Sequence, residues 1–112
     1  MTPIKEGDKL YIVTRSDISP GYQAVQSCHA LRLFTEEHPM IDEQWYKNSN
    51  YIALLSVNDE KSLLSLVQKA TNMGYCVSVY REPDVDDAIT AIAIEPASKK
   101  LLRNIPLALI ER

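Results

Sequence analysis

The sequence has little glycine, little cysteine and no long apolar run. Its three glycines in 112 residues leave no glycine-rich phosphate loop. Cys28 and Cys76 are isolated thiols, which are typical of buried small side chains in a reducing compartment. Cys28 and His29 are neighbours and point apart on a helix, so the cysteines and histidines do not have the spacing of a zinc site. No window approaches the roughly 18 apolar residues of a membrane span.

These absences lead to several expectations about class and location. The polar, charged residues 1–9 do not read as a signal peptide, so we expect a cytoplasmic protein with no membrane, metal or cofactor. A net charge of −3 and a pI near 5.3 argue against a protein that binds nucleic acid through its overall charge, and they leave room for a local basic patch. Residues 1–112 suit one domain with a modest core, which a dimer would naturally supplement.

Strand and helix patterns alternate along the chain. Strands are predicted at 10–15, 51–57, 76–80 and 89–94 from β-branched apolar runs. Helices are predicted at 20–37, after Asn58 up to Gly74, and near 98–103. Residues 40–46 are expected to form a short helix or an ordered loop, and 107–110 to pack as an extended tail. This order predicts an α/β protein, a three-layer α/β/α sandwich with a four-stranded mixed sheet.

Side-chain spacing predicts which helix faces are buried. In helix 20–37, capped by Ser19 with Pro20 at its first position, we expect Ala24, Cys28 and Leu31 to face the sheet, with Val25 and Phe34 beside them. In the helix after Asn58, the residues expected to point inward are Leu63, Leu64, Val67 and Ala70.

The first candidate site is the junction of the first strand and first helix. Ligands in such sheets bind at the carboxyl ends of strands, near helix N-termini that attract phosphates and oxyanions. Tyr22, Gln26 and His29 follow at i, i+4 and i+7 and share one helix face. Alternatively, Tyr22 and Gln26 face solvent and His29 is a hydrogen-bonded boundary residue.

A second group of candidates lies in and after an acidic loop at 82–87. Its carboxylates are Glu82, Asp84, Asp86 and Asp87, which together are able to supply a general base, orient a histidine or hold a hard cation. The alternative is a solvated turn. Thr90, at the start of the fourth strand, either faces the same cleft or reflects β-propensity alone.

Several of these residues together resemble the archaeal and eukaryotic type of peptidyl-tRNA hydrolase. The strand 11–17 ends in Arg15-Ser16-Asp17, similar to the family's Arg-x-Asp. The helix segment Gln26-Ser27-Cys28-His29-Ala30 resembles its Gln-Cys-Ser-His-Ala, and 90–96 resembles its Thr-Val-Leu-Ala-Ile-Gly-Pro strand. Residues 58–63 resemble the start of its middle helix. The resemblance covers residues 9–102.

The resemblance implies a four-stranded mixed sheet, usually in a homodimer, and hydrolysis of the ester between peptide and tRNA. His29, Gln26 and Thr90 match motif residues of the family. Its aspartate after the third strand falls near Glu82 or Asp84. Its helix-starting lysine falls on Tyr22, which is neutral at pH 7 and donates one hydrogen bond or stacks on a base.

Three functional hypotheses follow. In a hydrolase, the helix start at Ser19 and Gly21 would hold a phosphate or the oxyanion, and Tyr22 would stack on the terminal adenine. His29 with Glu82 or Asp84 would position a water, while Thr90 and Gln26 orient the ester. The alternative is a catalytically weak or silent binding protein acting as a dimer. A metal-dependent hydrolase that uses the acidic loop is the third hypothesis.

Overall fold

A computed structural model describes residues 3–110. Its elements are β1 (Lys9–Arg15), α1 (Pro20–Glu37), α2 (Pro39–Asn48), β2 (Tyr51–Val57), α3 (Glu60–Asn72), β3 (Val77–Glu82), the 3-10 turn η1 (Pro83–Val85), β4 (Ala88–Ile94), the 3-10 turn η2 (Pro96–Ser98) and α4 (Lys99–Leu102). The expected order of strands and helices is therefore confirmed. Among the described helices, none is long and apolar enough to cross a membrane.

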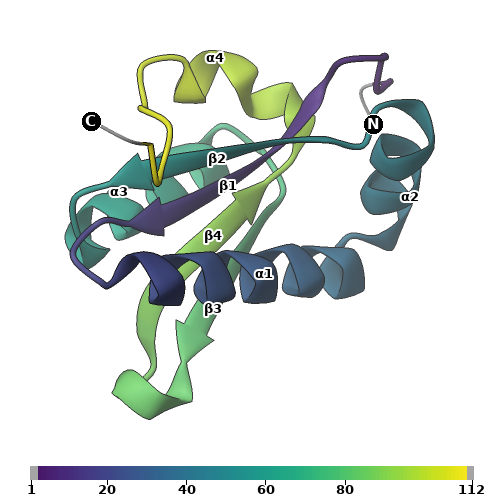
Figure 1. The fold of residues 1–112 in the computed structure, drawn as a ribbon. Coiled ribbons are helices and arrows are strands. Elements are labelled where there is room, and N and C mark those ends of the chain that lie inside the picture. The colour runs from purple at the N-terminus through teal and green to yellow at the C-terminus, as the bar shows by residue number, and fades with distance from the viewer. Residues whose placement is uncertain (1–2, 111–112) are drawn as a thin grey trace.

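The four strands form one mixed sheet in the order β2-β1-β4-β3. β1 pairs with β2 in parallel, whereas β4 runs antiparallel to both β1 and β3. The chain reaches β2 from β1 through α1 and α2, as a parallel connection requires. This arrangement confirms the predicted α/β fold with a four-stranded mixed sheet (Figure 1).

Helices cover both faces of this sheet, which makes three layers. Successive residues of β1 point to opposite faces: Leu10 and Ile12 pack with α1 and α2, around Phe34 and Trp45. Tyr11 and Val13 point the other way, into a core with α3 and α4. Figure 1 shows α1 lying along one face and α3 behind the sheet.

The buried face of α1 differs from the prediction. The residues that face the sheet are Gln23, Gln26, Ser27, Ala30 and Phe34. Of the residues expected to face it, Phe34 is buried and Leu31 is half-buried, whereas Ala24, Val25 and Cys28 are exposed. The observed stripe has the predicted period, but it is rotated by one residue, about 100° around the helix axis.

Hydrogen bonding explains this rotation. Buried polar groups are stable when they have partners, and the Gln23 amide donates to the Ile18 carbonyl (2.8 Å) while the Ser27 hydroxyl donates to the Gln23 carbonyl (2.7 Å). The expectation that Cys28 is buried was therefore wrong, because this thiol lies on the outer side of α1.

Three local expectations also need correction. Asp59, and not Asn58, caps α3, because its carboxylate accepts from the Ser62 N–H (2.8 Å). Leu64 is 41% exposed, and Leu66 takes the inward position. β3 continues past residue 80 to Glu82, so this residue ends a strand and does not begin a loop.

Candidate active site

Ser19 and Pro20 form a capped N-terminus at the start of α1. The Ser19 hydroxyl accepts from the Tyr22 N–H (3.4 Å), and Pro20 occupies the first turn, where no N–H is needed. The N–H of Gly21 has no acceptor among the described residues, and a Cβ at this position would meet no atom within 4 Å. The turn therefore presents an open backbone edge at the positive end of the helix.

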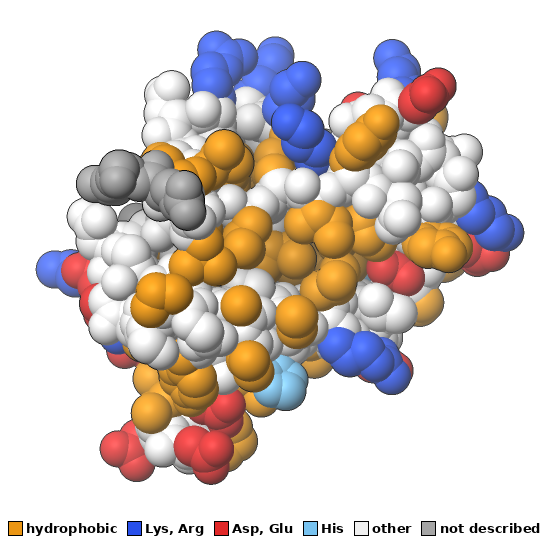
Figure 2. All heavy atoms as spheres, viewed as in Figure 1, with side chains coloured by type: hydrophobic (Ala, Val, Ile, Leu, Met, Phe, Trp, Pro, Cys, Tyr) orange, Lys and Arg blue, Asp and Glu red, His pale blue; other side chains and the backbone are white. Residues whose placement is uncertain are grey.

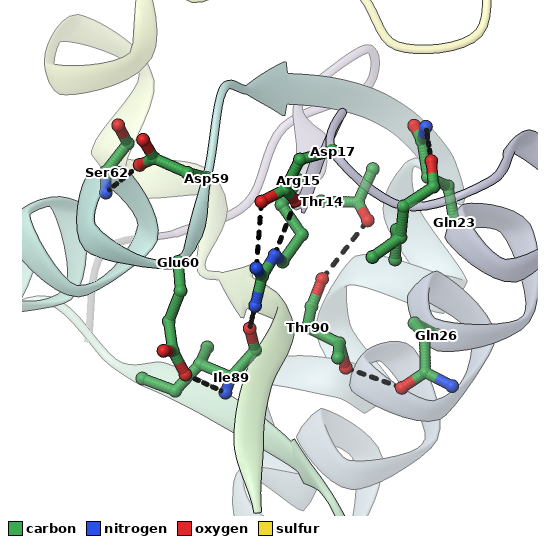
Figure 3. Close-up of polar contacts among 11 residues, drawn as sticks. Thr14, Arg15, Asp17, Gln23, Gln26, Asp59, Glu60, Ser62, Ile89 and Thr90 are labelled. Carbon is green, nitrogen blue, oxygen red and sulfur yellow. Dashed lines mark hydrogen bonds and ion pairs between the residues drawn. The ribbon is translucent and has the colours of Figure 1, made fainter. Parts of the chain in front are cut away.

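One turn further along α1, Gln26 links three elements of the fold. It is 0% exposed. Its Nε2 donates to Glu82 Oε1 at the end of β3 (3.0 Å), and its Oε1 accepts from the Thr90 hydroxyl on β4. The hydroxyl of Thr14 on β1 donates to the Thr90 carbonyl (3.2 Å), which extends the chain of hydrogen bonds across the sheet (Figure 3).

Glu82 is the acidic end of this chain. It is 8% exposed, and its second carboxylate oxygen accepts from the Asp84 N–H (3.3 Å). No ion pair within residues 3–110 involves it. Of the two acidic alternatives, Glu82 points inward, and the Asp84 side chain is exposed on η1. A buried carboxylate needs such hydrogen bonds to offset its lost hydration.

Tyr22 lies in the electrostatic field of the same carboxylates. Tyr22 is half-buried. Partial desolvation is the main cause that raises the pKa of its phenol, and the negative charges of Glu82 and Asp84 raise it further. The same causes raise the pKa of Tyr80 on β3. Both phenols thus remain proton donors at neutral pH.

The His29 imidazole stacks on Tyr80. The ring centroids are 4.7 Å apart and the planes differ by 13°. His29 is exposed and makes no hydrogen bond with Glu82 or Asp84 among the described residues. Stacking therefore fixes the ring plane while its nitrogens stay open to water.

A profile of the peptidyl-tRNA hydrolase PTH2 family matches residues 8–109 of this sequence. The chain belongs to that family. A solved structure of a protein of unknown function from Agrobacterium tumefaciens strain C58 has a similar fold, with a TM-score of 0.62, 12% identity, and coverage of 88% of this chain and 96% of that one. No curated protein matches the chain.

The resemblance seen in the sequence implies that Gln26, His29 and Thr90 match motif residues of the PTH2 family and that Tyr22 takes the place of its lysine. The structure connects Gln26 directly with Thr90 and Glu82. Three negative charges (Asp84, Asp86 and Asp87) follow Glu82 in the adjoining loop, so the charge balance of the site is acidic.

Sequence reasoning missed two groups of residues at this candidate site. The first is Tyr80, because no sequence signal places it against a histidine 51 positions earlier. The second group consists of Arg15 and Glu60, which bind the backbone of Ile89, next to Thr90. Arg15 Nη1 donates to the Ile89 carbonyl (3.1 Å), and a Glu60 carboxylate oxygen accepts from the Ile89 N–H (2.7 Å) (Figure 3). Arg15 is itself held by two hydrogen bonds to Asp17 (2.6 and 2.9 Å).

The end of the pairing between β1 and β4 explains why Arg15 and Glu60 bind the backbone of Ile89. β1 pairs with β4 only as far as Thr14 opposite Ala91, so the backbone of Ile89 lies past the end of its neighbour. The two side chains satisfy the backbone groups that a longer β1 would have paired. The Arg-x-Asp pattern was the available signal for this contact.

The described residues also bear on metal binding. Within residues 3–110, no group of three or more histidine, cysteine, aspartate or glutamate side chains is placed to hold a metal ion.

Proposed function

We propose that this chain hydrolyses the ester bond between a peptide and tRNA, in the cytoplasm. Family membership supports the reaction class. The single observation that carries the proposal for this chain is the buried Thr90–Gln26–Glu82 hydrogen-bond chain. It ends at the carboxylate whose charge acts on Tyr22 and Tyr80, and Tyr80 holds His29.

In the proposed reaction, His29 is the general base. A water held by the imidazole attacks the ester carbonyl carbon, and its proton passes to His29. The tetrahedral intermediate collapses, the bond to the ribose oxygen breaks, and His29 returns the proton to that oxygen. The products are a peptide with a free carboxyl group and tRNA.

Glu82, Gln26 and Thr90 are positioning residues in this scheme. Glu82 ends β3 two residues after Tyr80, on which His29 stacks, and its carboxylate accepts from Gln26. Gln26 is fully buried and both ends of its amide are occupied. Thr90 is likewise buried (1% exposed) and its hydroxyl donates to Gln26, so we assign both Gln26 and Thr90 to positioning Glu82 within the hydrogen-bond chain.

Tyr22 and the helix start would bind the nucleic-acid part of the substrate. The Tyr22 phenol is able to donate to the developing oxyanion or to stack on the terminal adenine. The open backbone at Ser19 and Gly21 suits a phosphate group. Tyr22 replaces a cation with a neutral donor, so we expect turnover to be slower than with lysine.

The second candidate is a catalytically silent binding protein on the same fold. The specific observation that favours it is the acidic character of the site, where Tyr22 takes the lysine position and Asp84 is exposed. In either case we propose a homodimer that covers the outer side of α1. Ala24, Val25 and Cys28 form an exposed apolar stripe there, which is unusual beside a polar buried stripe.

The test is release of a labelled peptide from peptidyl-tRNA by the purified, folded chain. His29→Ala should lower kcat by about 100-fold or more, whereas Glu82→Gln, which changes the carboxylate that accepts from Gln26, should lower it by a smaller factor. His38→Ala and Glu37→Gln, which change the same residue types away from the site, should leave it unchanged.

The assay also separates the alternatives. Absence of release above buffer at micromolar enzyme, with retained binding of the same peptidyl-tRNA, would support the silent binding protein. Release that survives EDTA would reject the metal-dependent hydrolase.

A further inference from the structure

A groove lies on the α3 side of the sheet, between β1 and β2 and the chain around α4. Its volume is about 460 Å³, within the roughly 300–1,000 Å³ typical of ligand pockets. Five aliphatic side chains line it: Ala53, Leu55, Leu102, Ile105 and Leu107. This composition suits a flexible hydrocarbon chain.

Four cations surround this aliphatic lining. They are Lys9, Lys99, Lys100 and Arg103, a third of the 12 lysines and arginines in a chain of net charge −3. None of them takes part in an ion pair among the described residues, and no carboxylate lines the groove. Figure 2 shows Lys and Arg side chains gathered at the top of the molecule, where Figure 1 places α4.

Tyr11 adds a hydrogen-bond donor to the lining. It is 7% exposed, and its hydroxyl makes no hydrogen bond among the described residues. It lines both the groove and a smaller adjoining hollow that contains Asp8, Lys9 and Lys99. The Tyr11 hydroxyl is therefore free to donate to an acceptor in this space.

We propose that this groove binds an amphipathic anion, with its aliphatic chain along the lining and its carboxylate or phosphate headgroup among Lys9, Lys99 and the Tyr11 hydroxyl. An RNA strand fits less well, because single-stranded RNA stacks its bases on aromatic faces, and Tyr11 is the one aromatic side chain among the lining residues. Tyr11 and Leu55 belong to the α3-side core, whereas α1 covers the other face. The groove is therefore separate from the His29 site and does not depend on its activity.

The experiment is an amide NMR titration of the full chain with decyl phosphate and with decanoate, each below the concentration at which it forms micelles. The amides of Ala53, Leu55 and 99–103 should shift with saturation, and those of 22–29 should not. Shortening the chain to octyl phosphate should weaken binding by up to about fourfold for each methylene removed. Decanol and inorganic phosphate, each with one half of the ligand, should bind at least about tenfold more weakly. Comparing the phosphate with the carboxylate identifies the preferred headgroup.

Variants at exposed positions separate binding from folding. Lys99→Gln with Lys100→Gln should weaken decyl phosphate by about tenfold, whereas Lys61→Gln with Lys69→Gln, an equal charge change on α3, should not. Leu107→Asp should weaken it further, since it places a carboxylate in the groove. Three results would overturn the proposal: no saturable shift at groove amides, equal weakening by the α3 control, or tighter binding of oligouridylate than of decyl phosphate at the same amides.

Discussion

Replacing Gln26 with leucine should destabilise the fold well beyond a usual surface change. The two side chains have similar size, so Gln26→Leu mainly removes an amide that accepts from Thr90 and donates to Glu82. Gln26 is 0% exposed, so water does not readily take over these contacts. The variant leaves one carboxylate oxygen and one hydroxyl without their partner.

The cost follows from those two groups. Leaving a buried polar group unpaired costs about 1–3 kcal/mol, with charged groups at the upper end. Glu82 keeps its contact with the Asp84 N–H, so we expect a total near 3 kcal/mol. Thr90→Val should cost about 1 kcal/mol. Since the double variant removes both partners of one hydrogen bond, its cost should fall short of the sum by about 1 kcal/mol.

Urea unfolding followed by tryptophan fluorescence measures these costs. Trp45 is the only tryptophan and is 4% exposed, so its emission should report loss of the α1-side core. Gln68→Leu, an exposed change on α3, is the matched control and should stay within about 0.5 kcal/mol. A loss below about 1 kcal/mol for Gln26→Leu, with an unchanged denaturant slope, would refute the reasoning.

Three further predictions concern a pH dependence, a rate and an assembly. The hydrogen bond from Arg15 lowers the pKa of Asp17 below its ordinary 3.8, so its stabilisation is present above pH 3.8 and is lost as the pH falls through the folded-state pKa. Asp17→Asn should cost about 0.5 kcal/mol at pH 6, allowing for solvent screening, and nothing near pH 2; equal costs in urea titrations would contradict this. Tyr22→Lys should raise the rate of peptidyl-tRNA hydrolysis by at least about tenfold, and an unchanged rate in the release assay would show that tyrosine is no deficit. Val25→Asp should convert a dimer to a folded monomer in sedimentation experiments, whereas a wild type that is monomeric at high concentration would exclude the dimer.

The order of elements could be predicted because its causes are local. Apolar β-branched runs are confirmed as β1, β2 and β4, and Ser19-Pro20 and Pro39 are confirmed at the two ends of α1. Gly74 follows α3 with a positive φ of 84°, which glycine adopts without strain. The resemblance to the PTH2 family also rests on short contiguous motifs, and the family match over residues 8–109 confirms it.

The rotation of α1 could not be predicted, because it depends on partners far along the chain. Hydrophobic periodicity placed Ala24 and Cys28 inward, but Gln26 finds Glu82 and Thr90 at 56 and 64 positions away. A partnered glutamine is stable in a core where an unpartnered one is not. Only the packed structure shows that those partners exist.

The sequence by itself determined the α/β class, the family, and the region where α1 begins, because periodicity, capping and contiguous motifs are properties of neighbouring residues. Tertiary structure decided that Glu82 points inward while Asp84 stays exposed, that Tyr80 stacks on His29, and that Arg15 and Glu60 hold Ile89. These contacts join residues from different strands and helices. They exist only when the sheet brings β3 and β4 beside α1, because side-chain hydrogen bonds and stacking act over a few ångströms in space, whatever the separation along the chain.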